Sequence, residues 1–145
     1  MQEDISNYIK TLDDYSLIST DTPLISNLNM LENIALIKEV HQHKSIVSAE
    51  KEAKDYLSKI NLEKISNNRV IQCSNLEIFY VKLIRALMTD EDNIIIVLPF
   101  SITTNLTDVK SFIDNIYMLN YKKILILELY TNKSKYEGSL CNIIK

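Results

Sequence analysis

The densest group of chemically capable side chains is an acidic run, Asp90, Glu91 and Asp92. Clustered carboxylates can bind a divalent cation, which makes this run a candidate metal site. It precedes the apolar run 93–98, however, and ligands of parallel α/β sheets gather where strands end, not where they begin. We therefore expect a solvated turn between a helix and a strand here.

Two histidines and two cysteines offer further metal-binding or nucleophilic groups. His41 and His43 are two residues apart on a predicted helix, so they point to nearly opposite sides and do not share one ion. Cys73 directly precedes a predicted helix N-terminus, where thiolates are favoured, but no histidine lies near it in sequence. Cys73 and Cys141 also lack metal-ligand spacing. We expect free thiols, with Cys73 buried and inert.

Polar residues at the predicted strand ends are few. Ser101 follows the apolar run 93–98, and Glu128 and Tyr130 follow the apolar run 124–127. No base and nucleophile pair up among them. A small α/β enzyme or nucleotide-binding protein remains the alternative function, and it would require Glu128 and Ser101 to share a pocket.

The composition narrows the function classes further. The chain has 145 residues, 46% of them hydrophobic and 24% charged, which fits one soluble domain. Its one glycine, Gly138, excludes glycine-rich phosphate loops. A net charge of −3 argues against nucleic-acid binding. No apolar run approaches the length of a membrane span and the start is unlike a signal peptide, so we expect a cytoplasmic protein.

Apolar periodicity predicts the elements that must position these residues. Asn29 with Glu32, and Ser74 with Glu77, have the spacing of helix capping boxes, and Ser48 is a candidate cap of the helix between them. The predicted elements are a strand at 15–19, a helix from 30 to 40, a helix at 48–60, a helix from 74 to 88, a strand at 93–98, a helix at 106–119, a strand at 124–127 and a last edge strand at 136–144. This alternation predicts an α/β domain with a short, mainly parallel sheet and flanking helices.

The order of these segments resembles the ATP-binding cassette (ABC) ATPase family downstream of its phosphate-binding loop. Residues 22–34 resemble the segment after the family's Q-loop, and residues 73–77 with 83–88 align with its L-S-G-G-Q and A-R-A-L motifs. Residues 93–101 stand where the Walker B strand and D-E-P-T-S belong. The resemblance covers about residues 4–130. It implies the C-terminal part of a P-loop NTPase fold, with a helical subdomain at about 26–90 and a sheet-containing core at 12–25 and 91–145.

The departures from the family pattern fall where its members handle magnesium, water or phosphate. The lysine-bearing phosphate loop is missing. The replacements are Thr20 for the Q-loop glutamine, Asn75 and Leu76 for the signature glycines between Ser74 and Glu77, Val97 and Leu98 for the Walker B aspartate and catalytic glutamate, Thr104 for the D-loop aspartate, and Leu129 near the switch histidine. The resemblance with these departures implies no ATP binding or hydrolysis, no cofactor and no metal.

The resemblance therefore predicts a non-catalytic ABC ATPase-like subunit, an interaction or regulatory module in a transport complex. Its partner would be an ABC ATPase paralogue or a permease subunit, with a homodimer as a further option, no nucleic acid, and contact with the membrane only at the inner face through the permease. In the family the region matching 26–60 faces the permease. The predicted contact residues are Leu24, Ile25, Leu28, Met30, Glu32 and Asn33, and we expect the first three to be partly exposed. A decayed ATPase remnant is a third reading.

The family comparison also predicts an unusual sheet edge. The strand at 124–127 would lack the neighbour that precedes the family's phosphate loop. An apolar edge with bare backbone groups is prone to aggregation. We expect the segment 136–144, or a second chain, to pair with it.

Overall fold

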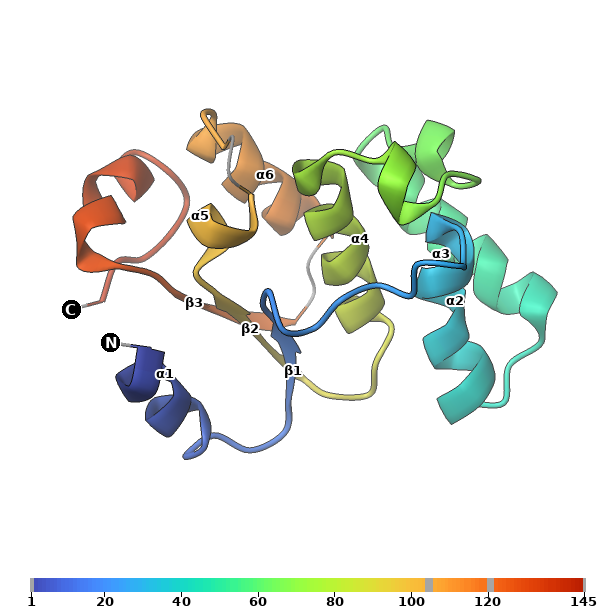
Figure 1. The fold of residues 1–145 in the computed structure, drawn as a ribbon, viewed down its shortest axis with the longest axis horizontal. Helices are drawn as coiled ribbons and strands as arrows, with labels where there is room; N and C mark the ends of the chain where they lie inside the picture. The colour runs from blue at the N-terminus through green and yellow to red at the C-terminus, as the bar shows by residue number, and fades with distance from the viewer. Residues whose placement is uncertain (1, 104–105, 120–121, 145) are drawn as a thin grey trace.

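The computed structural model describes residues 2–103, 106–119 and 122–144, and a three-stranded parallel sheet lies at its centre (Figure 1). The strands are β1 (Tyr15–Ile18), β2 (Asn93–Val97) and β3 (Lys123–Leu127), in the order β1-β2-β3. Ile18 lies opposite Ile96, which in turn lies opposite Ile126. The predicted α/β class and parallel sheet are confirmed.

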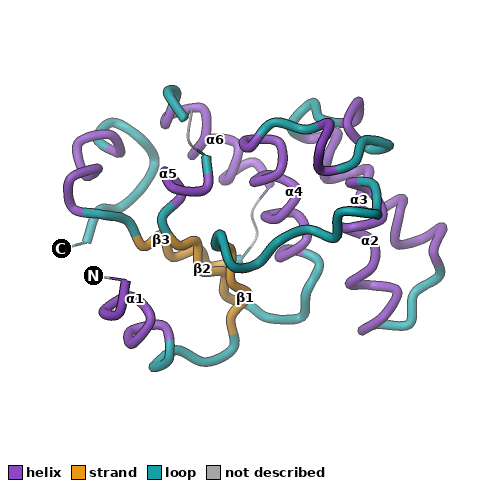
Figure 2. The backbone as a smooth tube through the Cα atoms, viewed as in Figure 1, coloured by secondary structure: helices purple, strands orange, loops and turns teal. Residues whose placement is uncertain are grey.

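Helices flank this sheet on several sides (Figure 2). Figure 1 shows the pair α2 and α3 on the far side of α4 from the sheet, with both chain ends near each other on the opposite side of the molecule. The α-helices are α1 (Gln2–Ile9), α2 (Met30–His41), α3 (Ile46–Lys59), α4 (Asn75–Leu87), α5 (Pro99–Ile102) and α6 (Val109–Leu119), and the 3-10 helices are η1 (Glu63–Ile65), η2 (Val70–Gln72) and η3 (Tyr130–Tyr136).

Alternation along β2 decides which face of the sheet carries the core. Ile94 and Ile96 are completely buried in the same cluster as Phe79 of α4 and Phe112 of α6. The rings of Phe79 and Phe112 lie 4.9 Å apart between centroids. Ile95 is also buried but lies outside that cluster, because successive strand residues point to opposite faces. The apolar run of β2 is therefore covered on both sides, as its sequence predicts.

Capping explains where three helices begin. Glu32 donates its N–H to Asn29 Oδ1 at 2.7 Å, and Glu77 donates its N–H to Ser74 Oγ at 3.1 Å, so both predicted capping boxes are confirmed. The cap predicted at Ser48 is wrong. Ser45 caps α3 by accepting the Ser48 N–H at 3.2 Å. Apolar periodicity missed this earlier start, because Ile46 and Val47 of the first turn are exposed and do not belong to the buried face of the helix.

The C-terminal segment is not the predicted edge strand. Residues 130–136 form η3, and the described residues after it contain no strand. Tyr136 is buried, its ring meets Phe100 edge-on at 5.7 Å, and its hydroxyl donates to Glu128 at 3.3 Å. Gly138 then turns the chain at a positive φ of 81°. These contacts hold the segment at the end of β3 and prevent it from lying along the strand.

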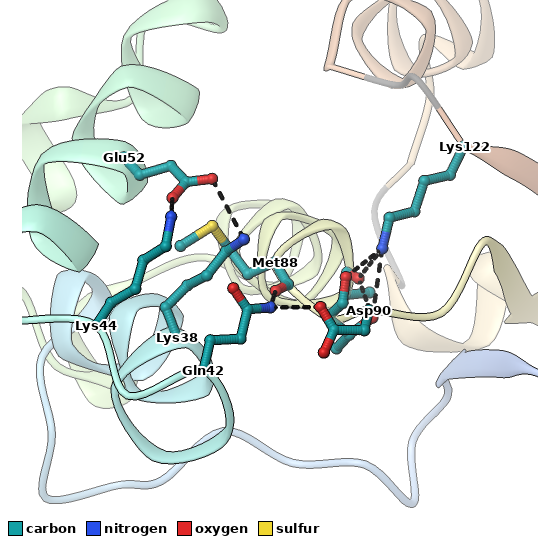
Figure 3. A network of polar contacts seen from close by, with 9 residues as sticks. Lys38, Gln42, Lys44, Glu52, Met88, Asp90 and Lys122 are labelled. Atoms are coloured by element: carbon teal, nitrogen blue, oxygen red, sulfur yellow. Dashed lines mark hydrogen bonds and ion pairs between the residues drawn. The ribbon is translucent and has the colours of Figure 1, made fainter.

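A polar network ties the end of α4 to its neighbours (Figure 3). Gln42 donates to the carbonyl of Met88 at 3.2 Å and to Asp90 at 2.7 Å. Lys122 donates to the carbonyl of Thr89 at 2.7 Å, just before β3 begins. Glu52 of α3 pairs with Lys38 and Lys44 at 3.6 and 3.7 Å. The network joins α2, α4 and β3 around one turn.

None of the helices in the described part of the chain is both long and apolar enough to cross a bilayer.

Candidate functional site

The β1–α2 loop, residues 19–29, leaves the C-terminal end of β1, where parallel sheets place their binding residues. A local turn begins it. Ser19 donates its N–H to Thr22 Oγ1 at 3.0 Å, and Asp21 donates its N–H to Ser19 Oγ at 3.1 Å. Ser19 is buried, whereas Thr20, Asp21 and Pro23 are exposed. The turn thus fixes its backbone internally and presents its tip to solvent.

Asn33 of α2 holds the second half of the loop. Its side chain accepts the Ile25 N–H at 2.8 Å and donates to the carbonyls of Ile25, Leu28 and Asn29 at 3.0, 3.3 and 3.0 Å. Only 1% of Asn33 is exposed. A buried amide with all these bonds satisfied fixes the backbone around it. Asn33 is therefore a scaffold of the loop and no contact residue itself.

Two cations of α4 hold the first half of the loop. Lys82 donates to the carbonyl of Ser19 at 3.2 Å, and Arg85 donates to the carbonyls of Thr22 and Pro23, each at 3.2 Å. Burial lowers the pKa of Lys82, and the positive charge of Arg85 lowers it further. Burial likewise lowers the pKa of Arg85. Our sequence analysis missed both residues, although a lysine between Val81 and Leu83 in a strongly apolar helix is a detectable signal.

The remaining predicted contact residues differ in exposure. Ile25 is 41% exposed and Leu28 is half-buried, so the prediction of partial exposure is confirmed for these two. It is wrong for Leu24, which is 8% exposed and packs into the core cluster. Met30 is completely buried, since it begins the apolar face of α2. Glu32 is half-buried and is part of the capping box, where its carboxylate accepts the Asn29 N–H at 3.1 Å.

The start of α2 offers no free anion site. The N–H groups of Met30 and Leu31 donate to the carbonyls of Asn68 and Ser66 at 2.9 and 3.1 Å. Since the Glu32 N–H is used by Asn29, the first turn has partners for the amides that a helix N-terminus normally leaves open.

The degenerate signature residues Ser74, Asn75 and Leu76 line a cavity of about 330 Å³, together with Cys73, Thr103 and Leu106. The Leu76 side chain stands on this rim where the family pattern has a glycine. Burial raises the pKa of the Cys73 thiol, and the nearby Glu77 carboxylate raises it further. Cys73 is half-buried, not fully buried as expected, and its raised pKa favours the unreactive thiol.

The strand ends carry structural contacts instead of a catalytic pair. Leu98 takes a left-handed conformation with φ 50° and donates its N–H to the carbonyl of Leu127 at 2.7 Å. Glu128 accepts from the N–H groups of Phe100 and Leu129 at 3.2 and 2.9 Å, as well as from Tyr136. Glu128 and Tyr130 line one groove, but the exposed Ser101 does not line it.

The acidic run and the histidines do not meet at a metal site. Asp90 is engaged by Gln42, and the charges of the acidic run favour the protonated form of Lys122, although burial is the larger effect and lowers the pKa of Lys122. His41 and His43 are both exposed. The described residues contain no cluster of three or more histidine, cysteine or acidic side chains able to hold an ion. Thr104 lies outside the described residues.

Solved structures with the same fold are ABC ATPase domains. The ATP-binding cassette MJ0796, in a dimeric post-hydrolysis state bound to ADP and Pi, matches 94% of this chain with 60% of its own, at TM-score 0.65 and 22% identity. MJ1267, an ATP-binding cassette of an ABC transporter, matches 79% of this chain with 51% of its own, at TM-score 0.61 and 19% identity. This chain thus spans only part of the length of both neighbours. No protein-family model and no curated protein matches the sequence.

Proposed function

We propose that this ABC ATPase-like chain is a non-catalytic interaction module of a transport complex. The observation that carries the proposal is the β1–α2 loop. Its backbone is held by Asn33, Lys82 and Arg85, while Ile25 and the turn residues Thr20, Asp21 and Pro23 stay exposed. A loop whose backbone is already fixed loses little conformational entropy on docking. Such a loop suits binding to a protein partner, either a permease subunit or an ABC ATPase paralogue.

The absence of ATPase activity is part of the same proposal. At the positions that resemble Walker B, Val97 and Leu98 place hydrocarbon where two carboxylates would hold magnesium and activate water. At the end of β3, Glu128 accepts from the N–H groups of Phe100 and Leu129 and from the Tyr136 hydroxyl, which supports a structural role for this carboxylate.

Calorimetry with Mg-ATP tests the catalytic part of the proposal. We expect no saturable binding up to millimolar nucleotide. A dissociation constant below about 100 μM, a binding free energy of roughly −5.5 kcal/mol, would contradict it.

Co-purification from the native host tests the interaction part. Ile25→Arg changes an exposed side chain whose backbone alone is held by Asn33, so the variant should fold. Met118→Arg on α6 is the matched control, because Met118 is 59% exposed and lies on another element. We expect a permease or ABC ATPase to co-purify with wild type and with Met118→Arg, and to be lost with Ile25→Arg. Equal recovery with all three proteins would remove the loop from the interface.

A further inference from the structure

An open groove follows the outer edge of β3. It has a volume of about 820 Å³ and is lined by α1, α6, β3, η3 and the C-terminal segment, together with the first residues of β1 and β2. Figure 1 shows β3 on the side of the sheet where the two chain ends lie, away from α2 and α3. Ile124, Leu125 and Ile126 form its floor, with Tyr8 on one wall and Ile116 on another. The groove therefore combines an unpaired strand with apolar walls.

The backbone of β3 points its free groups into this groove. Lys123 donates its N–H to Asp92, and Leu127 accepts from Leu98, so the odd residues of β3 bond to β2. In a parallel pair, the residues between them turn their N–H and C=O groups to the other side. These are Ile124 and Ile126, whose outward groups have no hydrogen bond within the described part of the chain. Two donors and two acceptors thus face the groove at strand spacing.

Lysines stand at both ends of the groove. Lys123 is exposed at the start of β3, and Lys133 of η3 lies beyond its end, with its Nζ 5.7 Å from the Tyr130 ring centroid. The lining holds more lysines than acidic residues, since Lys122, Lys123 and Lys133 stand against Asp13 and Glu128. Of the two acidic residues, Glu128 already accepts from backbone and side-chain donors, whereas Asp13 is exposed before β1. The positive charges of Lys123 and Lys133 favour an occupant with acidic residues at its ends. This local charge is opposite in sign to the net charge of the protein, which is −3.

The shape of the groove favours a single extended segment over a second copy of this chain. The floor is flanked by α1, η3 and the C-terminal segment. A symmetric dimer through β3 would have to fit a second α1, η3 and C-terminal segment beside these walls while bringing the two strands to the 4.7–4.9 Å spacing of paired strands. A lone strand has no walls of its own and reaches the floor.

We propose that the β3 groove binds an extended segment of another polypeptide by strand addition. The segment consists of β-branched apolar residues, and it carries an acidic residue at each end. Its backbone pairs with Ile124 and Ile126, its side chains fill the apolar walls, and its acidic ends meet Lys123 and Lys133. Strand addition gains affinity from main-chain hydrogen bonds and specificity from the pockets beside them. This docking site is separate from the β1–α2 loop and does not depend on the proposed function.

A defined peptide tests the proposal with the full chain. The probe is a seven-residue peptide of alternating valine and isoleucine with glutamate at both ends, blocked at its termini. We expect saturable binding with a dissociation constant below about 100 μM. In nitrogen-15 NMR spectra, the amides of Ile124 and Ile126 should shift and exchange more slowly, whereas those of Leu125 and Leu127 should change much less. This alternation distinguishes strand pairing from simple apolar contact.

Three controls make the result decisive. The same peptide N-methylated at alternate residues keeps its side chains but loses donors, and we expect at least tenfold weaker binding. Lys123→Glu should weaken binding several-fold, most strongly at low salt. Val47→Glu on α3, an exposed site far from the groove, should leave it unchanged. Equal binding of the methylated peptide, uniform shifts along β3, no saturable binding, or a dimer in which these amides are already protected would each overturn the proposal.

Discussion

A single buried side chain, Asn33, determines the conformation of the exposed loop. Its side-chain amide has four hydrogen-bond contacts with loop backbone, and only 1% of the residue is exposed to solvent. From the sequence, Asn33 is predicted as a residue that contacts a partner. Its role follows only from the loop carbonyls that the fold brings around it.

The first prediction concerns this residue. Asn33→Ala should lower the free energy of unfolding by about 2–3 kcal/mol, because it leaves the part-buried Ile25 N–H and the Leu28 carbonyl without their hydrogen-bond partner. Urea denaturation followed by circular dichroism measures the change. Asn27→Ala, at an exposed position of the same loop, should stay within about 0.5 kcal/mol of wild type. Similar losses for the two variants would show that Asn33 does not hold the loop.

The second prediction uses the buried tyrosine of η3. Burial raises the pKa of Tyr136 well above its usual value, and the charge and hydrogen bond of Glu128 raise it further. A raised pKa means that the unfolded chain loses this proton first as the pH increases. The stability due to Tyr136 is therefore complete below pH 10, the ordinary tyrosine value, and declines above it.

Tyr136→Phe should accordingly flatten the alkaline loss of stability, measured by urea unfolding between pH 8 and about 11. Glu128→Gln keeps an acceptor but removes the charge, so its alkaline loss should lie between those of Tyr136→Phe and wild type. A slope unaffected by Tyr136→Phe would indicate that other groups cause the loss.

At the scale of elements, the start of each helix depends on which polar side chain captures a backbone amide. Both predicted capping boxes formed because their two side chains are close in sequence and need no tertiary contact. The cap of α3 was harder to locate, since Ser48 directly precedes the good helix formers Ala49 and Glu50, whereas Ser45 precedes the β-branched Ile46 and Val47. The structure selects Ser45, and the Ser48 N–H becomes the donor.

These two serines provide a matched pair for a third prediction. Ser45→Ala should cost about 1 kcal/mol of stability, since it removes the cap of α3. Ser48→Ala should be neutral or slightly stabilising, because alanine is the better helix former at an exposed helical position. Thermal unfolding of both variants measures the difference. A larger cost for Ser48→Ala would place the helix start where the sequence alone suggested.

At the scale of the whole molecule, stability should decrease from the sheet toward the N-terminal helix. β2 is central, and Ile94, Ile95 and Ile96 are almost completely buried between its neighbours. In α1, by contrast, most described side chains are exposed. Regions with few buried contacts open locally at low free energy.

The fourth prediction is therefore an order of hydrogen exchange. Amides of β2 and of the buried middle of α4 should exchange slowest, through global unfolding, and those of α1 should exchange fastest among the helices. Native-state exchange read by NMR gives the ranking directly. Slow exchange throughout α1 would mean that this helix is held by contacts that the structure does not show.

The sequence alone determined the elements whose pattern is local and strong. The continuous apolar runs of β2 and β3 and the amphipathic face of α4 need no distant partner to be recognised, and together they specify the parallel α/β fold. Capping boxes are similarly local. The residue types alone show that Val97 and Leu98 carry no carboxylate. The lack of ATPase activity that this suggests stays a prediction.

Tertiary structure alone decided what depends on residues far apart in the chain. Lys82 reaches Ser19 across 63 positions, and Tyr136 is drawn to Glu128 and Phe100 instead of extending along β3. Leu24 and Leu28 are of one residue type in one loop, yet only Leu24 is buried in the core. The burial and the hydrogen-bond partners of a side chain are set by tertiary packing, because they depend on which surfaces of the protein come into contact. Local periodicity carries no information about those contacts, so two features emerged only from the fold: the hydrogen bonds by which Asn33, Lys82 and Arg85 hold the β1–α2 loop, and the failure of the C-terminal segment to cover the predicted edge of β3.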